Sequence, residues 1–150
     1  MNLEWKWYAW QELSPDALHA FLKLRSDIFV VEQNCVFSDM DGRDPACEHL
    51  CGFEGEALVA YLRLVPPGLK SDIPALGRLV VVKEQRRKGH SRKAIELGLA
   101  RCAERYPRLP VRAQAQAHLA PFYQTLGFTP SSAQYMEDGI PHIDMQWQSS

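Results

Sequence analysis

The sequence lacks several features that would place it in a membrane, secreted or nucleic-acid-binding class. No stretch approaches the about 20 consecutive apolar residues that a membrane-spanning helix needs. The first residues, Met1 to Lys6, contain no basic cluster followed by a long apolar stretch, so they do not indicate a secretory signal. Neither sign of charge predominates, since the chain has 17 Lys and Arg and 18 Asp and Glu. A protein that binds nucleic acid normally has an excess of basic residues. We therefore expect a cytoplasmic protein with no membrane and no nucleic-acid partner.

Cysteine is scarce, and its spacing argues against a metal centre. The four cysteines are Cys35, Cys47, Cys51 and Cys102. The segment Cys47-Glu48-His49-Leu50-Cys51 resembles one half of a zinc site, but structural zinc sites usually have a second Cys pair, which is missing here. Cys102 falls on the expected buried face of a helix. We expect free thiols, some of them packed as small hydrophobic residues, and no metal.

What the sequence does contain is the composition of an ordinary globular protein. Of its 150 residues, 46% are hydrophobic and 23% are charged. This length is typical of one domain that buries enough surface to fold without crosslinks. No repeat, low-complexity tract or linker interrupts it. We expect a single domain over residues 1–150.

Hydrophobic periodicity predicts alternating strands and helices. Ser14 and Pro15 suit the start of a helix whose apolar face continues to Phe29. Asp138 and Gly139 form a strong hairpin signal. The expected strands cover residues 3–10, 49–54, 57–65, 77–82, 109–115, a segment ending at 137, and 140–147. The other expected helices follow the turn 83–91, ending near 107, and cover 117–126, while 34–45 is expected to be an irregular polar loop.

The most informative segment is the turn between a buried strand and a helix, at residues 83–91. The strand ends in Val80, Val81 and Val82, and the turn contains Arg86-Arg87-Lys88-Gly89-His90-Ser91. Backbone N–H groups converge at a helix N-terminus, where the helix dipole favours anions, and Gly89 permits close approach. This pattern favours a diphosphate site, although a solvated basic turn is the alternative. It is neither a Walker P-loop nor a dinucleotide-binding fingerprint, because the required glycines are absent.

This segment resembles the central motif of the GNAT acetyltransferases, [QR]-x-x-G-x-[GA], with Ser91 in place of the usual Gly or Ala. Further on, Ala120-Pro121-Phe122-Tyr123-Gln124-Thr125-Leu126-Gly127-Phe128 resembles the second GNAT motif, A-x-x-[FL]-Y-x-x-x-G-F. Gln116 stands where many relatives have asparagine. Residues 24–35, 41–44, 49–50 and 137–143 are similar to the corresponding segments of the bacterial ElaA-like subfamily. Together these segments extend over nearly the whole chain.

The resemblance implies an α/β fold, the GNAT fold. Its central sheet is mixed but mostly antiparallel, has about six or seven strands, is splayed between strands 4 and 5, and is flanked by helices. It also implies an N-acetyltransferase that uses acetyl-CoA and transfers acetyl to a primary amine by direct attack. The implied cofactor-binding residues are Val80, Val81, Val82, Arg86, Arg87, Lys88, Gly89, His90, Ser91, Gln116, Phe122 and Tyr123.

The resemblance places Tyr123 beside the coenzyme A sulfur, where a phenol can act as general acid. Candidate bases for the amine are Glu32, His49 and His142. Each has a structural alternative, since Glu32 could pair with Arg25, His49 could be held by Asp44, and His142 could point outward on an edge strand.

Other roles are left open by the sequence. The acidic residues Asp39, Asp41 and Asp44 could attract a cationic amine or could simply belong to turns that face water. A non-catalytic acyl-CoA-binding sensor or interaction module with the same fold is the alternative function. The amine itself is not identified, and aromatic residues near both ends (Trp5, Trp7, Trp10 and Trp147) leave a homodimer open.

Overall fold

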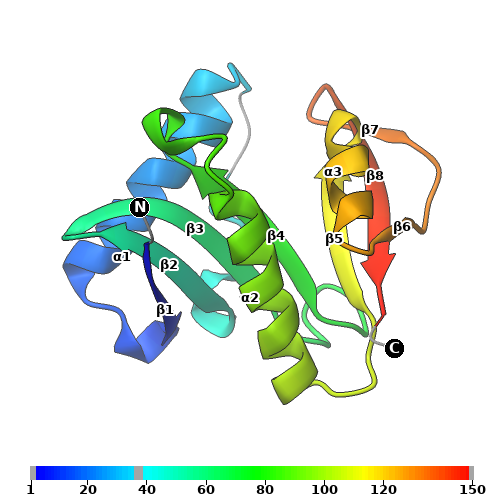
Figure 1. Ribbon diagram of the computed structural model, residues 1–150, viewed down its shortest axis with the longest axis horizontal. Helices are drawn as coiled ribbons and strands as arrows, with labels where there is room; N and C mark the ends of the chain where they lie inside the picture. The colour runs from blue at the N-terminus through cyan, green and yellow to red at the C-terminus, as the bar shows by residue number, and fades with distance from the viewer. Residues whose placement is uncertain (1–2, 36–38, 149–150) are drawn as a thin grey trace.

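A computed structural model describes residues 3–35 and 39–148, and its centre is one mixed eight-stranded sheet (Figure 1). The strands follow the order β1-β2-β3-β4-β5-β8-β6, and β7 also pairs with β8. All pairs are antiparallel except β4 with β5. The strands are β1 Glu4–Ala9, β2 Glu48–Glu54, β3 Ala57–Val65, β4 Ala75–Val81, β5 Val111–Gln116, β6 Thr129–Pro130, β7 Tyr135–Glu137 and β8 Ile140–Trp147.

Helices cover both faces of the sheet. The core on one face joins α2 to the sheet through residues such as Ile95, Leu62 and Leu76, and it includes Tyr123 of α3. On the other face, Phe21 of α1 packs against Tyr61 of β3. The helical segments are η1 Trp10–Glu12, α1 Pro15–Arg25, η2 Ser26–Glu32, η3 Asp44–Ala46, η4 Lys83–Gln85, α2 His90–Arg105, η5 Ala117–Leu119 and α3 Ala120–Thr125.

The first long helix begins as the sequence indicates and then changes its geometry. The hydroxyl of Ser14 accepts a hydrogen bond from the Ala17 N–H at 3.1 Å, and Pro15 occupies the first turn. From Ser26 to Glu32 the chain continues as a π-helix, a wider winding that is rare and often lies at functional sites. This segment carries Phe29 and Glu32 to one side of the gap between β4 and β5.

The parallel strands β4 and β5 pair only at their beginnings. The partners are Ala75 with Arg112 and Leu76 with Ala113, and beyond them the strands diverge (Figure 1). A bulge explains the divergence. Between Gly77 and Val80, β4 has one residue more than its partner β3, and Arg78 in the bulge has a φ of 50°. A bulge bends its strand and increases the local twist, so β4 leaves β5 at this point.

Most expected elements are confirmed, with small corrections. The expected splay between the fourth and fifth strands is present, and Asp138 and Gly139, with φ of 51° and 77°, form the hairpin turn. The short strand β6 was not expected, and it raises the strand count above the expected six or seven. Of the aromatic residues near the ends, Trp5, Trp7 and Trp147 pack against the core on the α2 face.

Candidate active site

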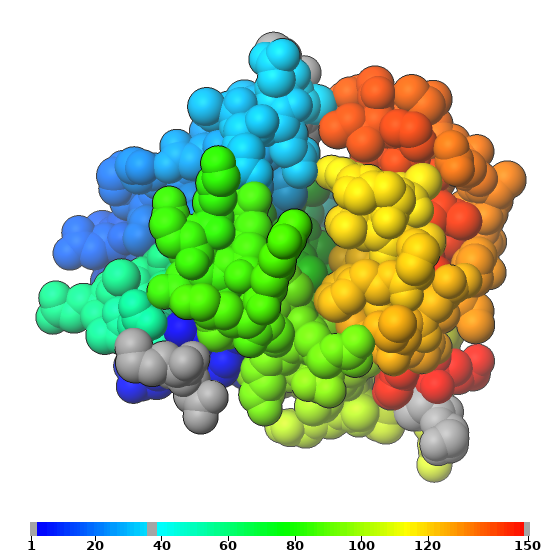
Figure 2. Space-filling view, turned by 45° about the horizontal axis from the view of Figure 1, so that its top comes forward, coloured from blue at the N-terminus to red at the C-terminus, as the bar shows by residue number. Residues whose placement is uncertain are grey.

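Three connected cavities form a groove through the gap between β4 and β5 (Figure 2). The central cavity, of about 250 Å³, lies among η2, the bulge of β4, β5 and the β7–β8 turn. The strand cavity, of about 430 Å³, follows Leu79, Val80 and Val81 and shares Tyr123 with the central cavity. The turn cavity, of about 210 Å³, is lined by Gln85, Arg86, Arg87, Gly89, His90, Ser91 and neighbours.

The turn before α2 offers unpaired hydrogen-bond donors to the turn cavity. Gly89, with a φ of 85°, is the N-terminal cap of α2, and Arg87 also has a positive φ of 65°. Lys93 is the first helical residue whose N–H finds a backbone acceptor, the carbonyl of Gly89 at 3.0 Å. A Cβ placed on Gly89 would meet no atom within 4 Å, so the space above the turn is open. The backbone here can surround an anion.

His90, the first residue of α2, has an unpaired polar atom beside the turn. Its side chain is buried and lines the turn cavity, and its Nε2 atom has no hydrogen-bond partner within the described residues. Buried polar atoms are normally paired, so an unpaired one needs an explanation.

The edge of β4 that faces the gap is available to an extended ligand. Val80 and Val81 pair with β3 on the other side, and β5 has already diverged where they lie. An unpaired strand edge can bind an extended chain as another strand would. Val82 is different, because its N–H donates to the carbonyl of Val59 at 2.9 Å.

Two basic side chains of the turn, Arg86 and Lys88, form hydrogen bonds with other groups of the protein. Arg86 donates through Nε to the carbonyl of Val81 and forms two hydrogen bonds with Glu32, of 2.8 and 3.1 Å. Lys88 donates to Gln85. The expected alternative partner of Glu32, Arg25, is engaged elsewhere. The guanidinium of Arg86 lowers the pKa of the Glu32 carboxyl, which makes Glu32 a weaker base.

Tyr123 stands where the central and strand cavities meet. Its ring packs edge-on against Phe122 and Phe128, with ring centroids 5.5 and 5.4 Å apart. The hydroxyl has no hydrogen-bond partner in the part of the chain that the structure describes. Burial raises the pKa of Tyr123 to about 12, so the phenol keeps its proton at neutral pH.

The two histidines proposed as bases lie in different surroundings, one in the core and the other at the groove. His49 is fully buried and lines none of the three cavities. Its Nε2–H donates to the Asp44 carbonyl at 2.9 Å, and its Nδ1 accepts from the Tyr61 hydroxyl at 2.6 Å, so both nitrogens are occupied. Desolvation lowers the pKa of His49. It braces the core rather than facing the groove.

His142 lines the central cavity together with Tyr123. It lies on β8 between Gln116 of β5 and Tyr135 of β7, so it is not on an edge strand. Its Nδ1–H donates to the carbonyl of Ile140 at 2.8 Å, which leaves the lone pair of Nε2 free. Gln116 lines the same cavity and bonds to Gln33 across it at 3.3 Å.

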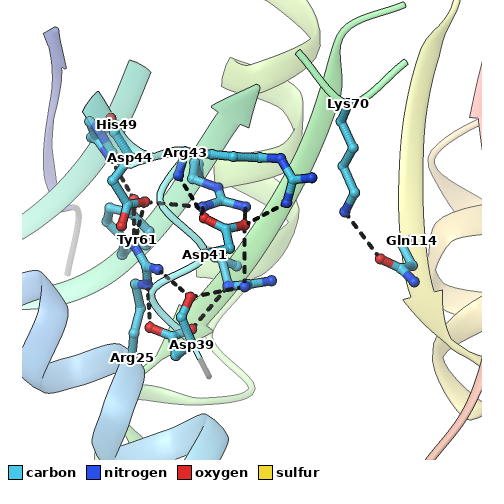
Figure 3. A network of polar contacts seen from close by, with 11 residues as sticks. Arg25, Asp39, Asp41, Arg43, Asp44, His49, Tyr61, Lys70 and Gln114 are labelled. Carbon is cyan, nitrogen blue, oxygen red and sulfur yellow. Dashed lines mark hydrogen bonds and ion pairs between the residues drawn. The ribbon is translucent and has the colours of Figure 1, made fainter. Parts of the chain in front are cut away.

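The acidic loop has a role that neither sequence interpretation included (Figure 3). Asp39 and Asp44 are buried and form ion pairs of 2.9 Å with Arg25, which is itself fully buried. Arg63 pairs with Asp41 and Asp44 at 2.8 and 3.0 Å. These carboxylates neither face water nor attract a free amine, because they hold the loop against α1 and β3.

Two residues of the groove went unnoticed in the sequence. Arg78 lines the central cavity from the β4 bulge and pairs with Asp39 at 2.9 Å. Gln114 lines the same cavity from β5. The alternation of Gln114 and Gln116 with buried alanines on β5 was the available signal, because it places both amides on one face.

The four cysteines are free and buried. Over residues 3–35 and 39–148, no group of three or more metal-ligating side chains is placed to hold a metal ion. No helix in the same ranges is both long and apolar enough to cross a membrane.

Comparison with known proteins gives concordant matches. A family profile described as "Acetyltransferase (GNAT) domain" matches residues 30–149. Protein ElaA of Escherichia coli K12 is 39% identical over 95% of both chains, and a UPF0039 protein of Synechocystis is 38% identical over 97% of this chain and 95% of its own.

Solved structures agree with these matches. The crystal structure of E. coli ElaA has a TM-score of 0.92 with this chain, 38% identity, and coverage of 97% and 99% of the two chains. An acyl-CoA N-acyltransferase from Pseudomonas aeruginosa has the same TM-score and coverage, with 35% identity. The chain therefore belongs to the GNAT family of acetyltransferases, among the ElaA-like proteins.

Proposed function

We propose that the protein is an N-acetyltransferase that moves the acetyl group of acetyl-CoA to a primary amine by direct attack. The observation that carries the proposal is the position of Tyr123, whose unpartnered phenol joins the two cavities. The turn at Gly89 would hold the diphosphate of the donor, and the free edge of β4 would hold its extended arm. Acetyl-CoA, when bound, supplies an activated thioester.

The central cavity would hold the amine. An alkylammonium with a pKa of about 10.4 costs about 4–5 kcal/mol to deprotonate at pH 7, so a base is needed. His142 is the best placed of the three candidates, because it lines this cavity with a free Nε2. Glu32 is engaged by Arg86, and His49 is buried outside the groove.

Tyr123 would give its proton to the departing sulfur. A phenol with a pKa of about 12 is too weak an acid for a thiolate in water, whose conjugate thiol has a pKa of about 8.5. Burial changes this balance. A thiolate that leaves inside the groove is also a stronger base than in water, because partial desolvation disfavours its charged form.

The test is the variant Tyr123→Phe, assayed with acetyl-CoA and a panel of primary amines. We expect kcat to fall by about 100-fold or more, because general acid catalysis typically contributes that much. Binding of CoA, measured by calorimetry, should change little. Tyr106→Phe, at the end of α2, is the matched control and should leave both quantities unchanged.

Two results would count against the proposal. Unchanged transfer by Tyr123→Phe across pH would remove the proposed acid. CoA binding by the wild-type protein without acetylation of any amine would instead favour a sensor or interaction module.

A further inference from the structure

A small notch of about 50 Å³ extends the central cavity toward the closed end of the gap between β4 and β5. The two spaces share Gly77, Arg78 and Gln114. Gly77 bears no side chain, and a Cβ there would meet nothing within 4 Å, so the space beside this shared residue is open. A ligand of the central cavity that is long enough to pass Gly77 and Gln114 can therefore reach the notch.

The lining of the notch is cationic. It includes Arg63, Lys70, Arg78 and Arg112, and no carboxylate among the described residues lines it. The three arginines already have partners. Arg63 pairs with Asp41 and Asp44, Arg78 with Asp39, and Arg112 with Asp144 at 3.1 Å.

Lys70 differs from these arginines, because no carboxylate of the described chain lies within 4 Å of its ammonium group. Its ammonium group donates a hydrogen bond to the amide oxygen of Gln114, across the gap, at 3.4 Å (Figure 3). Desolvation and the positive charges of Arg112 and Arg43 lower the pKa of Lys70. Lys70 is exposed, so its ammonium group is accessible to an anionic group that enters the notch.

Gln114 lies between the central cavity and the notch, and charged groups of opposite sign lie on its two sides. Its amide oxygen faces Lys70, while its NH₂ group donates to the carboxylate of Glu137 at 2.6 Å and to the hydroxyl of Tyr135 at 2.8 Å. Glu137 and Asp138 line the central cavity on the side of His142. The acidic end thus suits an ammonium group, and the end at Lys70 suits an anion.

We propose that the acyl acceptor is an amine that also carries a carboxylate, and that Lys70 binds this carboxylate in the notch. The inference rests on the proposed function, since it places the amine beside His142 and Tyr123. His142 lies opposite Gln116 on β5, while Gln114, the partner of Lys70, and Arg112 lie two and four residues before Gln116 along the same strand. With a rise of about 3.3 Å per residue, the amine and the carboxylate are roughly 7–13 Å apart.

This distance between amine and carboxylate limits which acceptors can bind at both ends. In the α-amine of an amino acid, nitrogen and carboxylate share one carbon atom and cannot reach both ends. An ω-amino acid or the N-terminal amine of a short peptide can.

The experiment compares three acceptors of equal length: 6-aminohexanoate, its primary amide and hexylamine. With acetyl-CoA, the wild-type kcat/KM should be about tenfold or more higher for the carboxylate than for the amide, as expected for a charge-assisted contact. Lys70→Gln should abolish this preference, mainly through KM, and leave hexylamine unchanged. Lys70→Arg should retain most of it. Lys6→Gln, in β1 at the far edge of the sheet, is the matched control.

The outcomes separate the two proposals. Equal use of the three acceptors by the wild type, or an equal loss for all three in Lys70→Gln, would overturn the role of Lys70 while leaving amine acetylation intact. Acetylation of none of them would count against the proposed function. In that case NMR titration of the CoA-saturated protein with 6-aminohexanoate still decides the inference, since shifts in the notch must disappear in Lys70→Gln.

Discussion

The carboxylate of Glu32 controls the direction of the Arg86 side chain. Two hydrogen bonds to Glu32 and one to the carbonyl of Val81 turn the guanidinium of Arg86 across the strand cavity. Both side chains of the pair are about 40% exposed, at 36% and 41%, so the pair contributes little to stability. Its consequence is local, because it places one negative charge beside the expected path of a polyanionic donor.

Neutralising Glu32 should therefore strengthen CoA binding. In Glu32→Gln, Arg86 loses its partner and a repulsive charge disappears, so we expect the Kd for CoA to fall roughly two- to fivefold, an effect that salt should weaken. Calorimetry at two ionic strengths measures this change. Glu104→Gln, at the other end of α2, is the control.

The same variant also tests a catalytic role. A general base contributes about 100-fold or more, so kcat should fall by that factor if Glu32 were the base. We expect kcat to stay within about twofold, because His142 is the proposed base; a large loss at saturating substrate would reassign that role.

At the scale of elements, the segment from α1 to η2 is held by one buried cation. Arg25 is fully buried, donates to Asp39 and Asp44, and lies over the rings of Phe21 and Tyr61 at 5.9 and 5.6 Å. It ties the end of α1 to the loop that follows η2. Because η2 lines the groove, this connection fixes one wall of the site.

Replacing Arg25 should cost much more stability than replacing a neighbouring surface cation. In Arg25→Met, two buried carboxylates lose a partner, and such a loss costs about 3–5 kcal/mol. Lys23→Met, also in α1, removes an exposed pair with Asp27 at the start of η2 and should cost under about 0.5 kcal/mol. Urea unfolding of both variants measures the difference. Similar costs would mean that the buried network adds no more than a surface pair.

Local sequence signals predicted most elements, because each had its own cap, periodicity or turn. Ser14 with Pro15, the alternation along β8, and Asp138 with Gly139 are examples. The π-helical winding of η2 has no such signal. Arg25 lies at the helical spacing of Phe21 and Phe29, but no local pattern indicates its burial, because its partners Asp39 and Asp44 come from a separate loop.

Sequence motifs proposed the turn at Gly89, Tyr123 and His142, which the structure places along the groove, but they gave no indication of the notch. Gly89 and Tyr123 belong to compact motifs whose chemistry is visible in a few adjacent residues. Lys70, Arg78 and Gln114 come from three separate segments, and only the bulge of β4 and the divergence of β5 bring them together. No local sequence pattern predicts that these three segments lie side by side.

At the scale of the whole molecule, the buried polar network couples folding stability to pH. Desolvation lowers the pKa of His49 below its ordinary value of 6.5, while Arg63 and Arg25 hold the pKa values of Asp41 and Asp44 below the ordinary 3.8 despite their partial burial. In each case the unfolded chain takes up a proton at a pH where the folded chain does not. Stability therefore falls as pH falls.

The two kinds of group act in different ranges. The contribution of His49 is fully present above about pH 6.5 and is lost below it, with a slope of up to about 1.4 kcal/mol per pH unit, until the folded protein also binds the proton. Asp41 and Asp44 add a second loss below about pH 4, where their unfolded carboxyl groups become protonated.

Urea unfolding between pH 7.5 and 3 should therefore show a decline in two stages. His49→Gln removes the titrating group and should flatten the first stage, between about pH 6.5 and 5, without removing the second. His19→Gln, on the exposed side of α1, is the control and should leave both stages in place. A free energy of unfolding that stays constant from pH 7 to 5 in the wild type would show that His49 is not held neutral by the core.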